Sequence, residues 1–318
     1  MCSVNFTHAL DFITYVLSLT MKITILGNNS ALPAYGRFPT AQIIEINEQL
    51  FLMDCGEGAQ MRMQQFGIRS TRINHIFISH LHGDHFYGLV GFVSSLSLWG
   101  REKELAIYCP AEIKTFLQLQ LKWDLGFQII YHIISDSERT ILIDEEKFQV
   151  SCFPVYHSVP THGFKFIEKK RKRILLPTKL QEYEVPKYFY KNLTEGEDYR
   201  LKNGDVVKND WVTQDGHPNK VYVFCADTRY APELCDDLRD ADIIYHESTY
   251  LENDQHKATE RFHSTAREAA SIAKQAGARK LLLGHFSSKY KDLQPFIDEA
   301  STVFEPVELA IEGCVFEI

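Results

Sequence analysis

The densest chemistry in the sequence lies in the hexapeptide HLHGDH at 80–85, which holds three imidazoles and one carboxylate. Imidazole and carboxylate groups are ligands that zinc and similar divalent metals bind well. In a tight turn, His80 and His82 can face one ion while Asp84 and His85 face another. The alternative interpretation is a histidine-rich surface loop that arose by chance, and the ligand types described next count against it.

Three further potential ligands each follow an apolar, strand-like run. His157, Asp227 and His285 come directly after runs that begin at 151, 221 and 280, and the hexapeptide itself follows a run at 74–79. Strands that end together at one edge of a sheet place their next residues around one cleft. We therefore expect these four distant positions to converge.

The elements that must position these side chains are short apolar runs alternating with helical patterns. Helices are expected near 58–66, 84–98, 113–123, 265–275 and 293–304, and the last strand is expected over 309–316. A capping signature at 264–268 marks the start of one helix. Many strands, joined in places by helices and in others by hairpins, predict an α/β sandwich of mixed sheets.

The composition is that of a folded protein of 318 residues, with 45% hydrophobic and 24% charged residues, which excludes disordered and fibrous classes. The net charge of −8 argues weakly against a nucleic-acid partner, although an average does not reveal patches. No apolar stretch is long enough for a transmembrane helix, so no membrane partner is expected. Seven scattered cysteines without a C-x-x-C pair favour a reducing cytoplasm.

Two segments stand apart from this pattern. Residues 1–20 are interpreted as an extension without function that precedes a catalytic domain at 21–318, with Met21 as the natural start. Residues 168–200 break the strand rhythm and are expected to leave the sandwich as an insertion. The overlapping stretch KFIEKKRKR at 165–173 has a charge of +5, against −13 for the remainder of the chain. Such a run is most often a solvated surface.

With four supporting motifs, the hexapeptide resembles the ribonuclease Z family of the metallo-β-lactamase superfamily, over essentially residues 21–318. These motifs are DCGEG at 54–58, HESTY at 246–250, HST at 263–265 and GHFSSKY at 284–290. The resemblance implies an α/β fold, the αβ/βα four-layer sandwich, with an inserted flexible arm. It also implies a zinc-dependent endoribonuclease that removes the 3′ trailer from precursor tRNA, leaving a 3′-hydroxyl on the tRNA and a 5′-phosphate on the trailer.

The resemblance further implies two zinc ions per chain. The first would be held by His80, His82 and His157, and the second by Asp84, His85 and His285, with Asp227 bridging them. Two divalent ions a few ångströms apart can activate a water and clamp the phosphate oxygens during in-line attack. Asp84 is accordingly expected to act both as a ligand and as the general base.

Two residues outside the ligand set are candidates for catalysis. We expect His263 to meet the scissile phosphate or to protonate the leaving 3′ oxygen, and Glu247 to orient its imidazole. Alternatively, His263 is an ordinary residue before a helix, and Glu247 is structural. The loop at 27–33, with Arg37, either receives a phosphate through its backbone N–H groups or is a plain hairpin turn.

RNA contacts are expected from the insertion and from the last motif. The residues concerned are Lys169, Lys170, Arg171, Lys172 and Arg173 in the insertion, and Ser287, Ser288 and Lys289 in the motif. The family is typically homodimeric, with the arm of one subunit serving the site of the other. Two alternatives remain: a small phosphodiesterase or thioesterase of the same fold, which would not need a basic arm, and a non-catalytic RNA-binding subunit, which should lack metal ligands.

Overall fold

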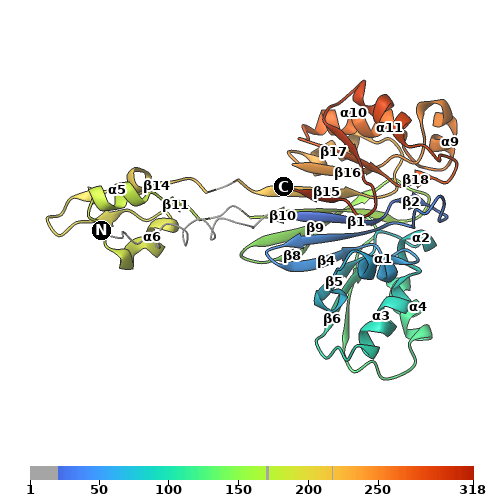
Figure 1. Ribbon diagram of the computed structural model, residues 1–318, viewed down its shortest axis with the longest axis horizontal. Helices are drawn as coiled ribbons and strands as arrows, with labels where there is room; N and C mark the ends of the chain where they lie inside the picture. Colours follow the sequence, from blue (N-terminus) through green and yellow to red (C-terminus); the bar gives the residue numbers. More distant parts are fainter. Residues whose placement is uncertain (1–20, 170–171, 217) are drawn as a thin grey trace, which may run out of the picture.

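The computed structural model describes residues 21–169, 172–216 and 218–318, so the expected extension at 1–20 and the cations Lys170 and Arg171 lie outside the described residues. Two seven-stranded sheets face each other (Figure 1). In spatial order, the first sheet contains β20 (Val315–Glu317), β1 (Lys22–Gly27), β3 (Ala41–Ile46), β4 (Gln49–Met53), β5 (Ile73–Phe77), β6 (Leu105–Cys109) and β7 (Ile129–Ile133). The second contains β19 (Val307–Leu309), β17 (Leu281–Gly284), β16 (Ile243–Glu247), β15 (Lys220–Cys225), β10 (Thr161–Glu168), β9 (Phe148–Val155) and β8 (Thr140–Asp144).

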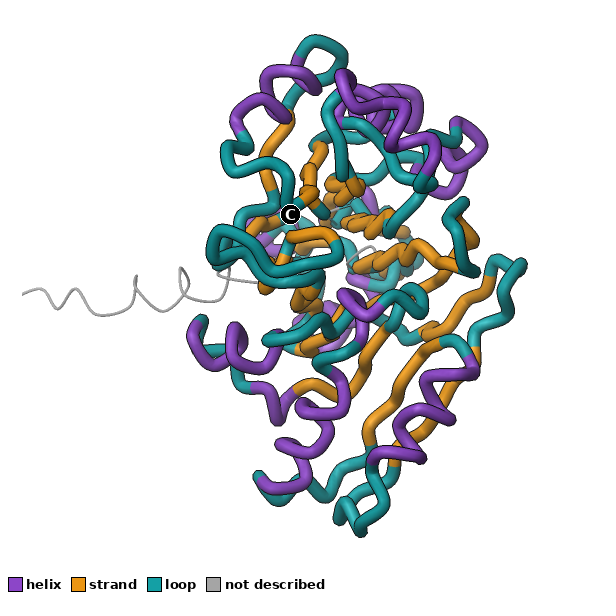
Figure 2. Tube along the Cα trace, turned by 90° about the vertical axis from the view of Figure 1, so that its right-hand side faces the viewer, coloured by secondary structure: helices purple, strands orange, loops and turns teal. Residues whose placement is uncertain are grey.

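Helices cover the outer face of each sheet (Figure 2). On the first sheet these are α1 (Ala59–Gln65), α2 (Gly83–Phe86), α3 (Leu89–Leu98) and α4 (Ala111–Gln120), with the short 3-10 helix η1 (Ser70–Arg72). On the second they are α8 (Cys235–Leu238), α10 (Ala266–Ala276) and α11 (Gln294–Ser301), accompanied by η3 (Pro232–Leu234), η4 (Glu252–Asp254) and α9 (Gln255–Glu260). The predicted four-layer sandwich of mixed sheets is confirmed. None of the helices in the described ranges is long and apolar enough to cross a bilayer.

Strand β15 shows why these sequences form buried strands. Tyr222 and Phe224 point into the core between the two sheets, whereas Val221, Val223 and Cys225 point into the core between the second sheet and its helices. A strand covered on both faces needs a continuous apolar run rather than an alternating one. This continuous run carries Asp227 to the edge of the sheet.

The expected helix start before α10 is confirmed. The Thr265 hydroxyl accepts a hydrogen bond from the backbone N–H of Glu268, whose carboxylate accepts one from the Thr265 N–H. This capping box satisfies two N–H groups that the first turn cannot pair within the helix. The helix ends at Gly277, which has a left-handed φ of 69°.

Two expected elements were wrong in extent. The strand at 309–316 is in fact two strands in different sheets, because the chain crosses the sandwich between Leu309 and Val315, with a turn at Gly313 (φ 84°). The helix at 84–98 is divided into α2 and α3. The division lies at Gly88, whose N–H donates to the Cys55 carbonyl at 2.9 Å instead of to the carbonyl four residues earlier, as a continuous helix would require.

The inserted arm leaves the sandwich after β10 and returns at β15, whose residues Glu168 and Lys220 pair across the two antiparallel strands. It extends past the expected 168–200 segment, to residue 219, and lies far from the edge that carries the predicted ligands (Figure 1). Its elements are β11 (Ile174–Leu175), α5 (Pro177–Glu182), η2 (Lys187–Phe189), α6 (Tyr190–Thr194), β12 (Tyr199–Arg200), β13 (Val206–Val207), α7 (Asn209–Val212) and β14 (Thr213–Gln214). They surround a small core of their own, formed by Leu180, Val185, Leu193, Val207 and Val212.

The strands that precede the predicted ligands end at one edge of the sandwich. Strands β15, β16 and β17 are parallel, and β9 runs in the same direction because β10 is antiparallel to both β9 and β15. In the first sheet, β4 and β5 are likewise parallel. At this edge the short parallel strands β2 (Asn29–Ser30) and β18 (Phe286–Ser287) join the loops of the two sheets.

Candidate metal centre

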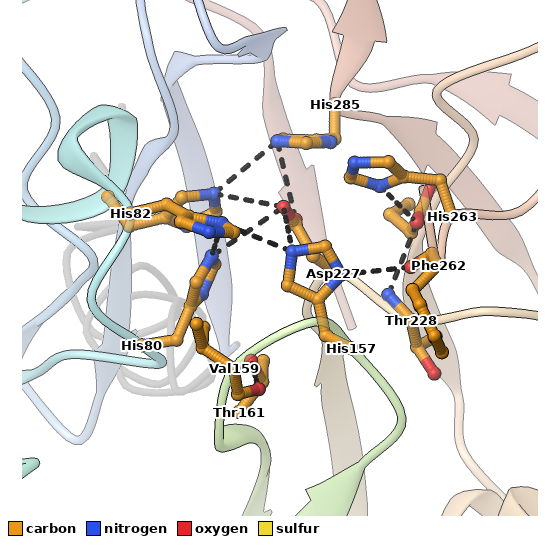
Figure 3. Close-up of polar contacts among 12 residues, drawn as sticks. His80, His82, His157, Val159, Thr161, Asp227, Thr228, Phe262, His263 and His285 are labelled. Carbon is orange, nitrogen blue, oxygen red and sulfur yellow. Dashed lines mark hydrogen bonds and ion pairs between the residues drawn. The ribbon is translucent and has the colours of Figure 1, made fainter. Parts of the chain in front are cut away.

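The first ligand group consists of three imidazoles and one carboxylate that meet at the sheet edge (Figure 3). The His82 Nδ1 atom lies 3.1 Å from Nε2 of both His80 and His157. The Asp227 Oδ2 atom lies 3.7 Å from His80 Nε2 and 3.9 Å from His157 Nε2. Four donor atoms therefore face a common point from three separate loops.

The second group lies directly beside the first. His85 Nε2 and His285 Nε2 are 3.4 Å apart, and Asp84 Oδ2 is 3.6 Å from the former and 3.4 Å from the latter. Asp227 joins the two groups, because its Oδ2 atom is 3.5 Å from His85 Nε2 and its Oδ1 atom is 3.3 Å from His285 Nε2. All seven residues singled out from the sequence thus come together, in two adjacent sets that share Asp227.

The second ring nitrogens of His157, His85 and His285 contact partners outside the centre. His157 Nδ1 donates a hydrogen bond to the Phe262 carbonyl at 2.9 Å, and His85 Nδ1 donates to Asp54 Oδ2 at 2.7 Å. His285 Nδ1 lies 2.9 Å from the Thr249 hydroxyl. Such contacts fix the tautomer and leave a single nitrogen free to bind a metal. The residues present therefore fit a pair of divalent ions.

Burial gives the imidazoles of the first group the protonation state that a metal needs, whereas at His85 the charges of Asp227, Asp84 and Asp54 outweigh burial and raise the pKa well above its usual value. Burial lowers the pKa of His80 well below its usual value and also lowers the pKa of His82 and His157, which keeps these imidazoles neutral at pH 7, as metal binding requires. Burial acts to raise the pKa of Asp227, but the imidazoles of His285 and His85 outweigh it and lower that pKa well below its usual value. The bridging carboxylate is therefore ionised.

A fully buried carboxylate lies behind the centre. Glu247 Oε1 accepts hydrogen bonds from His263 Nδ1 at 2.8 Å, the Ser264 N–H at 3.1 Å and the Thr228 N–H at 3.2 Å. Its Oε2 atom accepts from the N–H and the hydroxyl of Thr249, at 2.9 and 2.8 Å. Since the Thr249 hydroxyl donates its hydrogen to Glu247, its oxygen is left to accept a hydrogen bond from Nδ1 of His285. One carboxylate thus positions both His263 and a potential ligand.

His263 and Glu247 form a charged pair. Burial acts to lower the pKa of His263, but the charge of Glu247 and its hydrogen bond raise it to about 9. Burial likewise acts to raise the pKa of Glu247, and His263 lowers it. The His263 ring lies between those of His157 and His285, with centroid distances of 4.9 and 5.4 Å. A protonated imidazole is therefore positioned next to both ligand groups.

A cavity of about 520 Å³ opens onto the centre and is lined by the 30–33 loop, Asp84 and His263. The Ala31 N–H donates to Asp84 Oδ2 at 2.7 Å, so this loop directs one N–H at the expected general base. The φ of Gly83 is not in the left-handed region, so the turn itself does not require a glycine at this position. An added Cβ there would instead come within 2.1 Å of the Tyr87 ring, which also lines the cavity.

The residues expected to contact RNA are not part of this cavity. Ser287 and Ser288 are half-buried beside it, and the Lys289 ammonium is paired with Asp254. In the arm, Lys169 pairs with Asp144 and Lys172 with Glu195, while Arg173 pairs with both Asp210 and Asp215. The charges of Lys169, Lys172 and Arg173 are therefore neutralised locally.

The residues that hold the histidines were not identified from the sequence. Asp54 anchors His85 and also accepts hydrogen bonds from the backbone N–H and hydroxyl of Ser79. Thr249 connects Glu247 to the second ligand group, and Ala31 contacts Asp84. Asp54 begins the DCGEG motif and Thr249 lies in the HESTY motif. Their positions in these motifs are the signal by which the sequence could have identified them as functional residues.

Comparison with known proteins yields relatives along nearly the whole chain. Ribonuclease Z of Porphyromonas gingivalis is 39% identical over 294 residues, which cover 92% of this chain and 97% of that protein. Ribonuclease Z of Bacteroides fragilis is 37% identical over 295 residues, with the same coverage of 92% and 97%. The model of another family, described as Anti-Pycsar protein Apyc1, matches residues 21–158.

Solved structures agree with these relatives. The crystal structure of human tRNase Z, short form, is similar with a TM-score of 0.68 and 25% identity, covering 93% of this chain and 98% of that one. The metallo-β-lactamase fold protein YhfI from Bacillus subtilis has a TM-score of 0.67 at 20% identity, over 94% and 100% of the two chains, which shows the shared fold. Given relatives this similar over their full lengths, the chain belongs to the ribonuclease Z family and has the metallo-β-lactamase fold.

Proposed function

We propose that this chain is a zinc-dependent endoribonuclease that removes the 3′ trailer from precursor tRNA and leaves a tRNA 3′-hydroxyl. The observation that carries the proposal is the pair of ligand groups that share Asp227, in a chain whose full-length relatives are named ribonuclease Z. Phosphodiester hydrolysis suits such a centre, because it needs both an activated water and stabilisation of negative charge.

Two zinc ions would be held by the two groups, His80, His82 and His157 in one and Asp84, His85 and His285 in the other, with Asp227 between them. When bound, such ions supply a nucleophilic water at neutral pH and stabilise the charge on the phosphate. Metal analysis of the purified protein should find about two zinc ions per chain. Finding none, with no gain of activity when zinc is added, would contradict this assignment.

Asp84 would accept the proton of the attacking water. The hydrogen bond from the Ala31 N–H fixes its Oδ2 atom, and the charges of His85 and His285 hold its pKa below the usual range, against the effect of burial. His263 would donate a proton to the leaving 3′ oxygen, because Glu247 keeps it protonated at pH 7. One group is thus ready to take a proton and the other to give one.

The arm would bind the body of the tRNA at a distance from the cut. Contacts between cations and phosphates do not read sequence, which suits an enzyme that must accept many tRNAs. Lys169, Lys172 and Arg173 would serve after exchanging their carboxylate partners for phosphates. Ser287, Ser288 and Lys289 would act near the scissile phosphate.

The arm can be removed without opening the main cores, because its apolar residues form a separate cluster. Since Glu168 and Lys220 pair directly, residues 169–219 can be replaced by Asn-Gly, which forms a two-residue hairpin turn. This variant should lose cleavage of precursor tRNA but still hydrolyse bis(p-nitrophenyl) phosphate. Equal loss on both substrates would indicate that the arm is structural. No loss on precursor tRNA would refute the role of the arm in binding the substrate.

We also propose a cytoplasmic homodimer in which the arm of one subunit serves the site of the other. In support, the arm points away from its own metal centre (Figure 1), and the ends of α3 and α4 expose apolar side chains. Among them are Leu98 at 87%, Trp99 at 54%, Leu119 at 60% and Trp123 at 51% exposed. The described cysteines are free thiols, as a reducing compartment requires.

Subunit mixing tests the dimer. An Asp84→Ala subunit has an arm but no base, and the Asn-Gly variant has a base but no arm. If arms act across the dimer, unfolding and refolding the two together should restore cleavage of precursor tRNA that neither has alone. A monomeric mass by light scattering, or no restoration in a confirmed mixed dimer, would refute the arrangement.

A further inference from the structure

A second cavity, with a volume of about 350 Å³, shares no lining residue with the one described above. Its walls include Tyr156, Arg229 and Phe262, together with His157 itself. We propose that this cavity is a subsite for one nucleotide next to the scissile phosphate. The inference rests on the proposed function and specifies where single-stranded RNA would bind beside the cut.

The subsite is built from the same loops as the metal centre. Tyr156 precedes His157, Phe262 precedes His263, and Arg229 follows Asp227 by two residues. The Arg229 N–H also donates to the Tyr156 carbonyl at 2.9 Å, which ties two of these loops together. A nucleotide in this cavity would therefore have a fixed position relative to the reacting phosphate.

The side chains offer what a nucleotide requires. Tyr156 and Phe262 are 41% and 42% exposed, and the Arg229 guanidinium carbon lies 4.6 Å from the centroid of the Tyr156 ring. One Arg229 nitrogen donates to the Tyr230 carbonyl, and among the described residues no carboxylate forms an ion pair with Arg229, although Asp136 lies on the cavity wall. Exposed aromatic rings beside a guanidinium bind a base by stacking and a phosphate by charge.

The backbone of Phe262 supports a role in binding. Its φ of 57° is left-handed, a conformation that glycine adopts freely and phenylalanine does not. The conformation directs its carbonyl at His157 Nδ1, and this contact needs no side chain at position 262. The ring belongs to none of the described apolar cores and remains exposed. A glycine would thus serve the fold better, so the ring is best explained by a ligand.

The decisive variant is Phe262→Gly, because it removes the ring while retaining the backbone that holds His157. It would be tested in the full-length, zinc-loaded enzyme on three precursor tRNAs. One is unmodified, one has an abasic residue at the last tRNA nucleotide, and one has it at the first trailer nucleotide. On the unmodified substrate, kcat/KM should fall by about 5- to 140-fold, the range expected for one stacked base.

The abasic substrates show which base the ring contacts. At the matching position, the wild-type enzyme should lose the same factor and Phe262→Gly should lose nothing further, whereas the losses should multiply at the other position. Coupling at either position supports the subsite and assigns it to the tRNA side or to the trailer side. Full multiplication at both positions, or no effect on the unmodified substrate, would overturn it.

Arg229→Met provides a second test, with the exposed Arg69→Met as the matched control. The Arg229 change should lower kcat/KM for precursor tRNA more than for bis(p-nitrophenyl) phosphate, and should reduce the salt dependence of RNA binding by about one phosphate contact. The control should change neither. If the wild-type enzyme cleaves no precursor tRNA, the proposed function fails. If the wild-type enzyme cleaves precursor tRNA normally but neither Phe262→Gly nor Arg229→Met has the expected effect, only the subsite fails.

Discussion

Replacing Glu247 by glutamine preserves the shape of a buried side chain but removes one of its two acceptor oxygens. In the structure those oxygens accept hydrogen bonds from five donors, three at Oε1 and two at Oε2. An amide has one oxygen and one NH₂ group. The donors at one of the two former oxygen positions would therefore face the NH₂ group, which is itself a donor. The less costly orientation keeps the oxygen at Oε1 and leaves the Thr249 N–H without an acceptor.

The expected cost follows from this count. A buried N–H left without a partner costs about 1–3 kcal/mol, and replacing a charged acceptor for His263 by a neutral one costs about 1 kcal/mol more. The Thr249 hydroxyl can rotate and adds little. Glu247→Gln should therefore lower the free energy of unfolding by about 2–4 kcal/mol, which is large for a change that leaves side-chain volume intact.

Urea unfolding of the metal-free protein measures this difference, with Glu260→Gln on the exposed side of α9 as the matched control. The control should lie within about 0.5 kcal/mol of wild type. Cleavage of precursor tRNA by the zinc-loaded Glu247→Gln enzyme should also fall, because His263 loses the charge that keeps it protonated. A loss of stability below about 1 kcal/mol would refute the hydrogen-bond reasoning.

Three further outcomes are expected. Asp84→Asn should lower single-turnover cleavage of precursor tRNA by roughly 10³-fold, the scale of general base catalysis, with a circular dichroism spectrum like that of wild type; near-normal turnover would remove its role. Asp54→Asn should weaken zinc binding by about 10- to 100-fold in chelator competition, because His85 loses its anchor; unchanged affinity would contradict this. Since the pKa of His263 is raised to about 9, the stability it contributes to the metal-free protein should be complete below pH 6.5 and disappear as the pH rises through 9. Urea unfolding across that range checks the sign, and no such loss would be inconsistent with the pair formed with Glu247.

The position of the metal centre could be predicted because it depends on strand direction. Ligands that follow apolar runs meet whenever those strands end at one edge, and the runs before His157, Asp227 and His285 do so. The four layers could be predicted for the same reason, since strands buried on both faces need helices outside. The sandwich crossing between Leu309 and Val315 could not, because an apolar run does not reveal that it changes sheets.

The groups that hold the ligands could not be predicted because their contacts depend on three-dimensional geometry. Asp54 and Thr249 each follow or end a strand, as the ligands do, but nothing in their spacing shows that one anchors His85 and the other His285. The strained Phe262 is a similar case, since sequence alone gives no reason for a large side chain at a left-handed position. Its role becomes visible only when its carbonyl is seen on His157.

The charge of the arm shows how far a local count can mislead. The run at 165–173 carries +5, yet Lys172 and Arg173 form ion pairs with Glu195, Asp210 and Asp215, which lie much later in the sequence. Exposed ion pairs of this kind are weak, so a phosphate can replace a carboxylate at little cost. The number of phosphates that the arm neutralises is therefore set by which pairs the RNA exchanges. Affinity for tRNA should follow that exchange, and it cannot be read from the net charge of the run.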